Sequence, residues 1–182
     1  MKSMYRMKTN AQATRRRTPA SANGTAIHHV NGARVEVRAS GVHGKGVYAK
    51  RPIAAGETII EYKGEHISWA EAQRRHPVNP EDPNHTFFFH IDDERVIDGG
   101  RRGNAARWIN HACEPNCDTD EVDGRVFVRA LRDIAAGEEL FYDYRLMLEG
   151  RHTAKVKREY ACHCGKPGCR GTMLAPKRRG RA

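Results

Sequence analysis

Three cysteines lie within eight residues near the C-terminus, as Cys162, Cys164 and Cys169 in a C-x-C-x-x-x-x-C pattern. Thiolates this close in sequence are typical ligands of Zn²⁺, and a closed structural site needs four ligands. The chain has five cysteines, which is an odd number, and its first residues lack the apolar stretch of a secretory signal. We therefore expect a metal site rather than a set of disulfides.

The fourth zinc ligand must be His163 or one of the two remaining cysteines, Cys113 and Cys117. His163 lies between two of the expected ligands, where reaching the same ion would strain the backbone. We favour Cys113, and the sequence leaves all three residues as candidates.

The formal net charge of +10 lies entirely in the two ends of the chain. Residues 1–26 contain six basic residues and residues 175–182 contain four, with no acidic residue in either segment. Residues 27–174 are neutral, with 22 basic and 22 acidic residues, which weakens the case for a basic nucleic-acid groove. We expect the tails to be disordered and capable of nonspecific nucleic-acid contact.

The neutral part is long enough for one domain with its own core. No apolar run approaches the ~20 residues that a membrane span needs, so we expect a soluble, intracellular protein without membrane contact. Short β-rich segments dominate, which predicts a mainly β fold. The expected strands cover residues 34–38, 57–62, 86–91 and, after an Asp123-Gly124 turn, 125–131.

One helix is predicted after Ser68, because Ser68 and Glu71 form a capping box and Pro77 prevents a longer helix. The pentapeptide Ile-Ala-Ala-Gly-Glu occurs twice, at residues 53–57 and 134–138. We interpret each copy as a glycine-containing turn that precedes a strand.

Three further segments concentrate residues that can carry chemistry. The glycine-rich residues 41–48 lack the features of a dinucleotide or phosphate loop and alone indicate only a turn. Residues 107–117 combine Asn, His and Cys, typical of a buried polar network or a metal site. A strand at residues 138–144 would place Tyr142 and Tyr144 on one face, as ordinary core tyrosines or as site residues.

In this order and spacing, the segments together resemble a SET domain followed by a post-SET segment, the fold of protein lysine methyltransferases. The resemblance covers residues 34–174 and is carried by four motifs. They are Gly44-Lys45-Gly46-Val47-Tyr48, the E-Y-x-G-E run at residues 61–65, the G-N-x-x-R-F-x-N-H-x-C-x-P-N signature at 103–116 and the E-L-x-Y/F-D-Y ending at 139–144.

The resemblance implies several small β-sheets, short helices and a knot-like crossing of the Asn110-His111 and Tyr142–Tyr144 segments. It divides the chain into a disordered basic tail at 1–26, a SET domain at 27–148, a post-SET zinc segment at 149–174 and a basic tail at 175–182.

The resemblance also implies S-adenosylmethionine as cofactor, with the post-SET segment closing over it, and one Zn²⁺. The zinc ligands would be Cys113, Cys162, Cys164 and Cys169, leaving Cys117 free. The expected cofactor-binding residues are Lys45, Gly46, Tyr48, Tyr62, Arg107, Asn110, His111, Tyr144, Met173 and Leu174.

Three positions match the family's catalytic centre. Tyr144 would orient the lysine amine and the methyl group, and Tyr142 would limit the space for further methyl groups, which favours monomethylation. Phe87 aligns where many members have a tyrosine. Trp108 in place of Phe and Ala112 in place of Ser are interpreted as packing variation.

The expected substrate is a basic protein, a histone or a histone-like DNA-binding protein. The alternative is a noncatalytic SET scaffold that binds basic tails or nucleic acid. Acidic residues 92–94 and 118–123 could attract such a tail, and Lys2, Lys8 and Lys177 lie in histone-tail-like contexts that suggest self-methylation. Nucleus and chromatin, a bacterial cytoplasm and delivery into a host cell all fit the composition.

Overall fold

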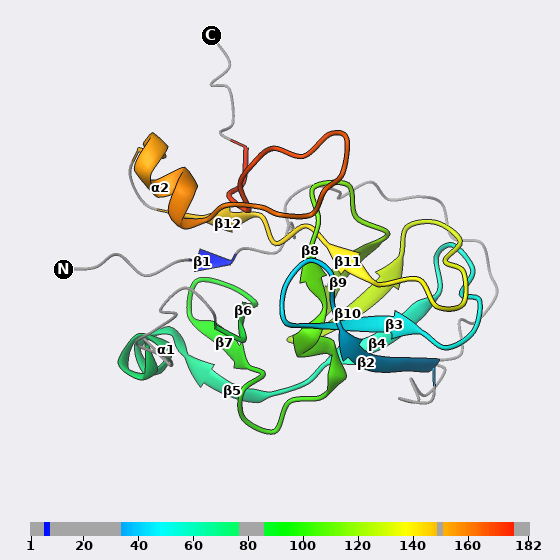
Figure 1. The fold of residues 1–182 in the computed structure, drawn as a ribbon. Helices are drawn as coiled ribbons and strands as arrows, with labels where there is room; N and C mark the ends of the chain where they lie inside the picture. The colour runs from blue at the N-terminus through cyan, green and yellow to red at the C-terminus, as the bar shows by residue number, and fades with distance from the viewer. Residues whose placement is uncertain (1–5, 8–33, 77–85, 149–150, 177–182) are drawn as a thin grey trace, which may run out of the picture.

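The computed structural model describes residues 6–7, 34–76, 86–148 and 151–176, and these residues form small β-sheets with short helices (Figure 1). This confirms the mainly β prediction. The remainder of the basic tails lies outside the described residues. Among those described, no helix is long and apolar enough to cross a membrane.

The central sheet has three antiparallel strands in the order β4 (Thr58–Tyr62), β10 (Arg125–Ala130) and β9 (Cys117–Val122). Asp123 and Gly124 both have positive φ, +52° and +78°, as the two-residue turn between β9 and β10 requires. Both strands of this sheet that the sequence predicts, at 57–62 and 125–131, are confirmed to within one residue.

Two further sheets flank the central one. The hairpin of β2 (Val35–Ala39) and β3 (Lys45–Ala49) encloses the glycine-rich turn. A second three-stranded sheet has the order β5 (Glu65–Ser68), β7 (Arg95–Asp98) and β6 (Phe88–His90). Strand β6 is shorter than the predicted segment 86–91, and Thr86 and Phe87, which directly precede it, line a cavity.

The predicted helix is α1 (Trp69–Arg75), with Ser68 as its N-cap. The Ser68 hydroxyl accepts from the Glu71 N–H, and the Glu71 carboxylate accepts from Arg75 Nε at 2.8 Å. The helix ends before Pro77, which lies outside the described residues.

A parallel pair of short strands joins two distant parts of the chain. β8 (Asn110–His111) pairs with β11 (Phe141–Tyr142), with Asn110 opposite Phe141 and His111 opposite Tyr142. The 3₁₀ helix η2 (Ala105–Trp108) precedes β8. This pairing brings together the two segments whose crossing the resemblance implies.

The two Ile-Ala-Ala-Gly-Glu copies lie side by side. The main chains of Ile53 and Ile134 exchange two hydrogen bonds of 2.9 Å. Gly56 and Gly137 adopt nearly the same left-handed conformation, with φ of +80° and +81°, which favours glycine. Each copy is therefore a turn, as expected, and the two turns also pair with each other.

The C-terminal segment contains β12 (Leu146–Met147) and α2 (Ala154–Glu159). Helix α2 was not predicted, because its Lys- and Arg-rich residues have no apolar periodicity; Thr153 caps it. Strand β1 (Arg6–Met7) pairs with β12, so the prediction of a wholly disordered tail at 1–26 is wrong for these two residues. Ala175, assigned to the other tail, donates to the Leu146 carbonyl at 2.9 Å.

Candidate active site and metal centre

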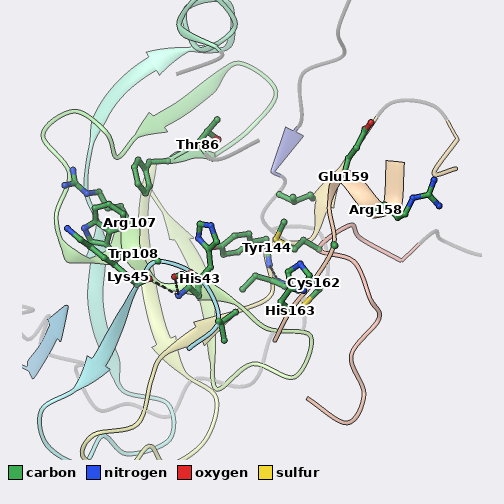
Figure 2. Close-up of a pocket in the computed structure, with 18 residues that line it drawn as sticks. His43, Lys45, Thr86, Arg107, Trp108, Tyr144, Arg158, Glu159, Cys162 and His163 are labelled. Atoms are coloured by element: carbon green, nitrogen blue, oxygen red, sulfur yellow. Dashed lines mark hydrogen bonds between the residues drawn. The ribbon is translucent and has the colours of Figure 1, made fainter. Parts of the chain in front are cut away.

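A cavity of about 570 Å³ separates the sheets from the C-terminal segment. Figure 2 shows Tyr144 near its middle, with Lys45, Arg107 and Trp108 on one side and Cys162, His163 and α2 residues on the other. Its volume lies within the range of ~300–1,000 Å³ typical of small-molecule sites.

Six of the ten residues predicted to bind the cofactor line this cavity, and four do not. Those that line it are Lys45, Arg107, Asn110, His111, Tyr144 and Met173. The others, Gly46, Tyr48, Tyr62 and Leu174, are not among the lining residues. Of the predicted catalytic residues, Phe87 and Tyr144 line the cavity, whereas Tyr142 is buried behind it.

The side chain of Asn110 holds the glycine-rich loop in place through hydrogen bonds. Its Nδ2 donates to the carbonyls of Lys45 and His43 at 2.9 and 3.3 Å, and to Glu139 Oε1 at 3.1 Å. A Cβ at Gly46 would overlap the Glu139 carboxylate, so only glycine allows this approach. The side chain of Asn110 therefore shapes the loop.

Glu139 accepts hydrogen bonds from several residues at the glycine-rich loop, a role that was not predicted. Its carboxylate also accepts from the Ser40 hydroxyl at 2.8 Å and the Tyr48 hydroxyl at 2.9 Å. This explains why Tyr48 does not line the cavity. The only sequence signal for this role was the carboxylate at the start of the closing motif.

Tyr144 is held by two hydrogen bonds. Its hydroxyl donates to the Ile109 carbonyl at 2.8 Å, and its N–H donates to His111 Nδ1 at 3.1 Å. Burial raises the pKa of the Tyr144 phenol above its ordinary value. The ring therefore presents a fixed, protonated hydroxyl.

His111 is buried in the neutral form, because burial lowers its pKa to about 4. The neutral Nδ1 can accept the Tyr144 N–H, as an imidazolium could not. Its ring centroid lies 5.3 Å from that of Tyr144. His111 thus positions the closing motif as well as lining the cavity.

Other aromatic rings surround the Tyr144 side of the cavity. The Tyr142 ring centroid lies 5.0 Å from that of Tyr144, with the two ring planes tilted by 46°. The predicted strand at 138–144 is wrong in length, because β11 contains only Phe141 and Tyr142. The Tyr62 hydroxyl donates to the Phe87 carbonyl at 2.8 Å, which fixes the chain beside the cavity. Burial raises the pKa of Tyr142 and of Tyr62, which keeps both phenols protonated.

Trp108 is flanked by two cations. Lys45 Nζ lies 4.8 Å and Arg107 Cζ 5.0 Å from a Trp108 ring centroid. Arg107 also donates to the Gly99 carbonyl at 3.1 Å, while its buried Nε has no hydrogen-bond partner among the described residues. This wall can accept an anionic group of a bound molecule.

Four thiols meet where the C-terminal segment touches the sheets. The Sγ atoms of Cys113, Cys162, Cys164 and Cys169 all lie within 4.8 Å of one another. Cys113 is 3.7 Å from Cys162 and 4.0 Å from Cys169. Tetrahedral zinc with Zn–S bonds of ~2.3 Å places its sulfurs ~3.8 Å apart, so this donor set fits Zn²⁺.

The cluster groups Cys113, rather than Cys117 or His163, with the three C-terminal thiols. Burial raises the pKa of the Cys117 thiol to about 12, which keeps it protonated. Cys117 therefore lies outside the cluster, and His163 lines the cavity instead.

A partly buried ion pair provides a second attachment for the C-terminal segment. The guanidinium of Arg170 donates to both carboxylate oxygens of Asp143, at 2.8 and 2.9 Å. Asp143 is the carboxylate between the two tyrosines. Its partner lies 27 residues away in the chain, so no local sequence pattern indicates the pair.

The SET domain family model matches residues 44–145 of the chain. Among curated proteins, the chain is 41% identical over 140 residues to histone-lysine N-methyltransferase ATX2 of Arabidopsis thaliana, covering 74% of this chain and 12% of that protein. It is 42% identical over 139 residues to the H3 lysine-4 specific histone-lysine N-methyltransferase of Candida albicans, with coverages of 74% and 13%. It is 41% identical over 140 residues to histone-lysine N-methyltransferase trithorax of Drosophila melanogaster, with coverages of 75% and 4%.

The chain thus spans about an eighth or less of the length of these relatives. The residues that the family model matches include Cys113 but not the three C-terminal cysteines. The family match begins at the glycine-rich loop and ends just after Tyr144.

Proposed function

This chain belongs to the SET-domain family, and from that premise we propose that it is a protein-lysine N-methyltransferase that uses S-adenosylmethionine and acts on a histone tail. The observation that carries the proposal is a single cavity whose wall joins the glycine-rich loop, the Asn110-His111 strand, Tyr144 and the C-terminal segment. The relatives are named as enzymes, which favours catalysis over the alternative of a noncatalytic scaffold.

The cofactor would be held between Lys45, Asn110 and His111 on the sheet side and Met173 on the C-terminal side. The cavity fits it in size, and the cationic wall at Lys45 and Arg107 suits a carboxylate. When bound, S-adenosylmethionine supplies a methyl group activated by a positively charged sulfur. Gly46, Tyr48, Tyr62 and Leu174 would act by supporting the residues that line the cavity.

The protein must present the substrate lysine as a neutral amine, because an ammonium has no lone pair. Lysine has an ordinary pKa of ~10.4, and an apolar, aromatic channel disfavours its charged form. Phe87, Trp108 and Tyr144 provide such walls. The proton then leaves to solvent before the amine reaches the reaction site.

Tyr144 would position the amine and the methyl group in line, which is the protein's main contribution to the rate. Its phenol is protonated and fixed by Ile109, so we assign it a positioning role rather than that of a base. Tyr142, directly beside it, would limit the room for added methyl groups, which favours monomethylation. Phe87 in place of a tyrosine leaves more room on the opposite wall.

Zinc would be bound by Cys113, Cys162, Cys164 and Cys169 and would have a structural role. Four thiolate ligands fill the coordination sphere and leave no open position for substrate. The metal would fix the C-terminal wall of the cavity. The reaction itself would take place on the other side of that wall.

The substrate we propose is histone H3, with lysine 4 as the first residue to test, and chromatin as the compartment. The Candida albicans relative is named for that lysine. The relatives named above come from a plant, a fungus and a fly, so they give no support to a bacterial cytoplasm or to delivery into a host. The boundaries at residues 27–148 and 149–174 stay predictions.

The two acidic stretches are weak candidates for substrate docking. Asp92 accepts from the N–H groups of Glu94 and Arg95, and Asp120 pairs with Arg129 at 2.9 Å. These carboxylates already have local partners. The substrate tail is therefore better placed by main-chain contacts near the cavity.

Methyl transfer to an H3 peptide, followed by mass spectrometry, tests the proposed function. Tyr144→Phe should lower kcat by ~100-fold or more, because a positioning contact is lost. Tyr160→Phe removes a buried phenol hydroxyl outside the cavity and is the matched control. Absence of a thermal shift with S-adenosylhomocysteine, together with no methyl transfer, would overturn the enzyme assignment.

A further inference from the structure

The charges of residues 27–174 are separated along the chain, although their sum is zero. Residues 27–150 contain 16 basic and 21 acidic residues, whereas residues 151–174 contain six basic residues and one acidic residue. The C-terminal segment therefore has a net charge of +5, which an equal negative charge in the preceding residues balances. A neutral domain can thus still carry a basic surface, and this one belongs to the segment that forms one side of the cavity.

Four cations of the C-terminal segment are exposed, and none of them forms an ion pair with another residue that the structure describes. These four, which we call the basic patch, are Arg151, Lys155, Lys157 and Arg158. The other two cations of the segment have partners. Arg170 pairs with Asp143, and Lys166 Nζ lies 5.7 Å from the ring centroid of Phe141.

Exposed arginines of the SET core differ from the basic patch in having carboxylate partners. Three such pairs are Arg74–Glu71, Arg95–Asp92 and Arg129–Asp120. The charge of each of these arginines is largely balanced within the protein. The charge of the basic patch is not, so it remains available to a bound partner.

Helix α2 directs the cations of the patch away from its own packing face. Thr153 caps the helix, and Val156 packs against the small apolar cluster of the C-terminal segment. Successive residues of a helix are rotated by ~100°, so Lys155, Lys157 and Arg158 lie on the faces that Val156 leaves to solvent. Figure 1 shows α2 at the edge of the molecule, apart from the central sheet β4–β10–β9.

The basic patch lies at the rim of the proposed reaction site. Arg158 and Glu159 line the cavity on its C-terminal side (Figure 2). A histone tail is itself rich in lysine and arginine, and like charges placed side by side oppose binding. The patch therefore does not suit the substrate tail. It suits a polyanion that accompanies the tail.

We propose that the basic patch binds the phosphate backbone of duplex DNA, so that the enzyme acts on histone tails presented beside DNA. This inference deepens the proposed function and rests on it. Histones wrap DNA through contacts that do not read the base sequence, which brings phosphate groups close to histone substrates. Lysine and arginine side chains bind those phosphates independently of sequence. The patch thus recognises the DNA, and the cavity receives the lysine.

The main chain connects the basic patch to the cavity. The carbonyl of Tyr160, which directly follows α2, accepts from the Met173 N–H at 2.9 Å and from the Thr172 hydroxyl at 3.0 Å. Met173 lines the cavity. DNA bound to the patch is therefore held at a defined place relative to the proposed reaction site.

Binding of a short labelled DNA duplex to the full chain, measured by fluorescence anisotropy without cofactor, tests the patch. The variant carries three changes, which are Arg151→Gln, Lys155→Gln and Lys157→Gln. Glutamine keeps a good helix propensity, and Arg158 stays in place at the cavity. We expect Kd to rise about tenfold or more near physiological salt, and the slope of log K against log salt to fall in magnitude by about 3.

The matched control removes the same charge from cations that already have carboxylate partners. Its three changes are Arg74→Gln, Arg95→Gln and Arg129→Gln. Its duplex affinity should stay within about threefold of that of the unmodified chain. If the patch variant binds as tightly as the unmodified chain, or if both variants lose equal affinity, the patch is not the binding surface. Tighter binding of single-stranded RNA than of the duplex would overturn DNA as the partner.

Methyl transfer to nucleosomes and to an H3 peptide separates this inference from the proposed function. The patch variant should lower kcat/KM on nucleosomes about tenfold and leave kcat/KM on the peptide within about twofold, because the peptide carries no phosphate. Equal losses on both substrates would overturn the role of the patch. An unmodified chain that binds the duplex but methylates neither substrate would overturn the proposed function alone.

Discussion

The SET core and the C-terminal segment are held in place by different forces. The core buries one large apolar cluster, in which residues such as Val47, Ile97 and Leu140 are almost completely inaccessible. The C-terminal segment contributes only a small cluster of Leu146, Tyr160 and Leu174. It also meets the core at the proposed metal ligands, at the ion pair between Asp143 and Arg170 and at a hydrogen bond from the Gly168 N–H to Glu114.

This difference shows where the molecule can open without unfolding. Burial of each aliphatic side chain contributes ~1.5–3 kcal/mol to the free energy of unfolding. The stability of the core is therefore the sum of many contributions, and a single substitution removes only one of them. The C-terminal segment depends on a few bonds, each of which can be removed on its own. The cavity lies between the two parts, so changes in the second part should affect binding before folding.

Disruption of the proposed metal centre should have the largest effect. Cys113→Ser takes away the thiol that the SET core contributes, and structural zinc supplies ~10 kcal/mol or more of binding free energy. We expect zinc content to fall and methyl transfer to drop ~100-fold, while the core keeps its cooperative thermal transition. Metal analysis, activity and calorimetry of one preparation measure all three.

Cys117→Ser is the control for this change, because the Cys117 thiol is buried outside the cluster. It should keep full zinc content. If Cys113→Ser retains zinc, or if the core transition disappears with the metal, the separation between the two parts is wrong.

A pair of cavity-forming changes compares the two parts directly. Ile97→Ala in the core should lower the global free energy of unfolding by ~2–5 kcal/mol. Leu174→Ala removes a similar buried volume from the small cluster and should mainly speed amide hydrogen exchange in residues 151–176. Equal effects on global unfolding, measured in denaturant, would mean that both parts fold as one unit.

The ion pair between Asp143 and Arg170 should have a smaller effect. Arg170→Lys keeps the charge but loses the two-pronged geometry, which should cost ~1–2 kcal/mol of local stability and raise KM for the cofactor. Arg125→Lys alters a similar pair with Glu61 on the exposed surface. That control should lower stability by less than ~1 kcal/mol. If Arg125→Lys lowered stability more than Arg170→Lys, the more buried pair would not be the stronger one.

The smallest expected effect is a pH dependence within the core. The ion pair with Arg132 lowers the pKa of Glu138 to about 2, from an ordinary value near 4.5. A carboxylate whose pKa is lowered by folding stabilises the folded state at pH values above its pKa in the unfolded chain. This stabilisation is lost as the pH falls from about 4.5 toward 2. Glu138→Gln should therefore cost ~1 kcal/mol at pH 7 and almost nothing near pH 2. A difference that persists at pH 2 would exclude this origin.

Local signals predicted much of the fold. The Asp-Gly turn, the Ser68 cap and the β-rich runs each depend on neighbouring residues, and each was confirmed. Helix α2 was missed because its polar sequence gives no period, so that only the Thr153 cap marked it. Strand β1 was missed because a two-residue pairing has no local signal at all.

The residues of the candidate site that belong to a sequence motif were the ones that could be predicted. Asn110, His111 and Tyr144 line the cavity, and Cys113 joins the C-terminal thiols. Residues that act through a distant partner were harder to predict. The role of Glu139 depends on the glycine-rich loop far earlier in the chain, and that of Asp143 on Arg170, so only the folded arrangement identifies them.

The paired Ile-Ala-Ala-Gly-Glu turns have a consequence for synthesis. Their two isoleucines, Ile53 and Ile134, lie 81 residues apart, and the parallel pair β8–β11 closes later still. Contacts this distant slow folding, because a long loop must be ordered first. A nascent chain on the ribosome therefore exposes its first apolar strands until the second turn has emerged, and during that interval it is most dependent on chaperones.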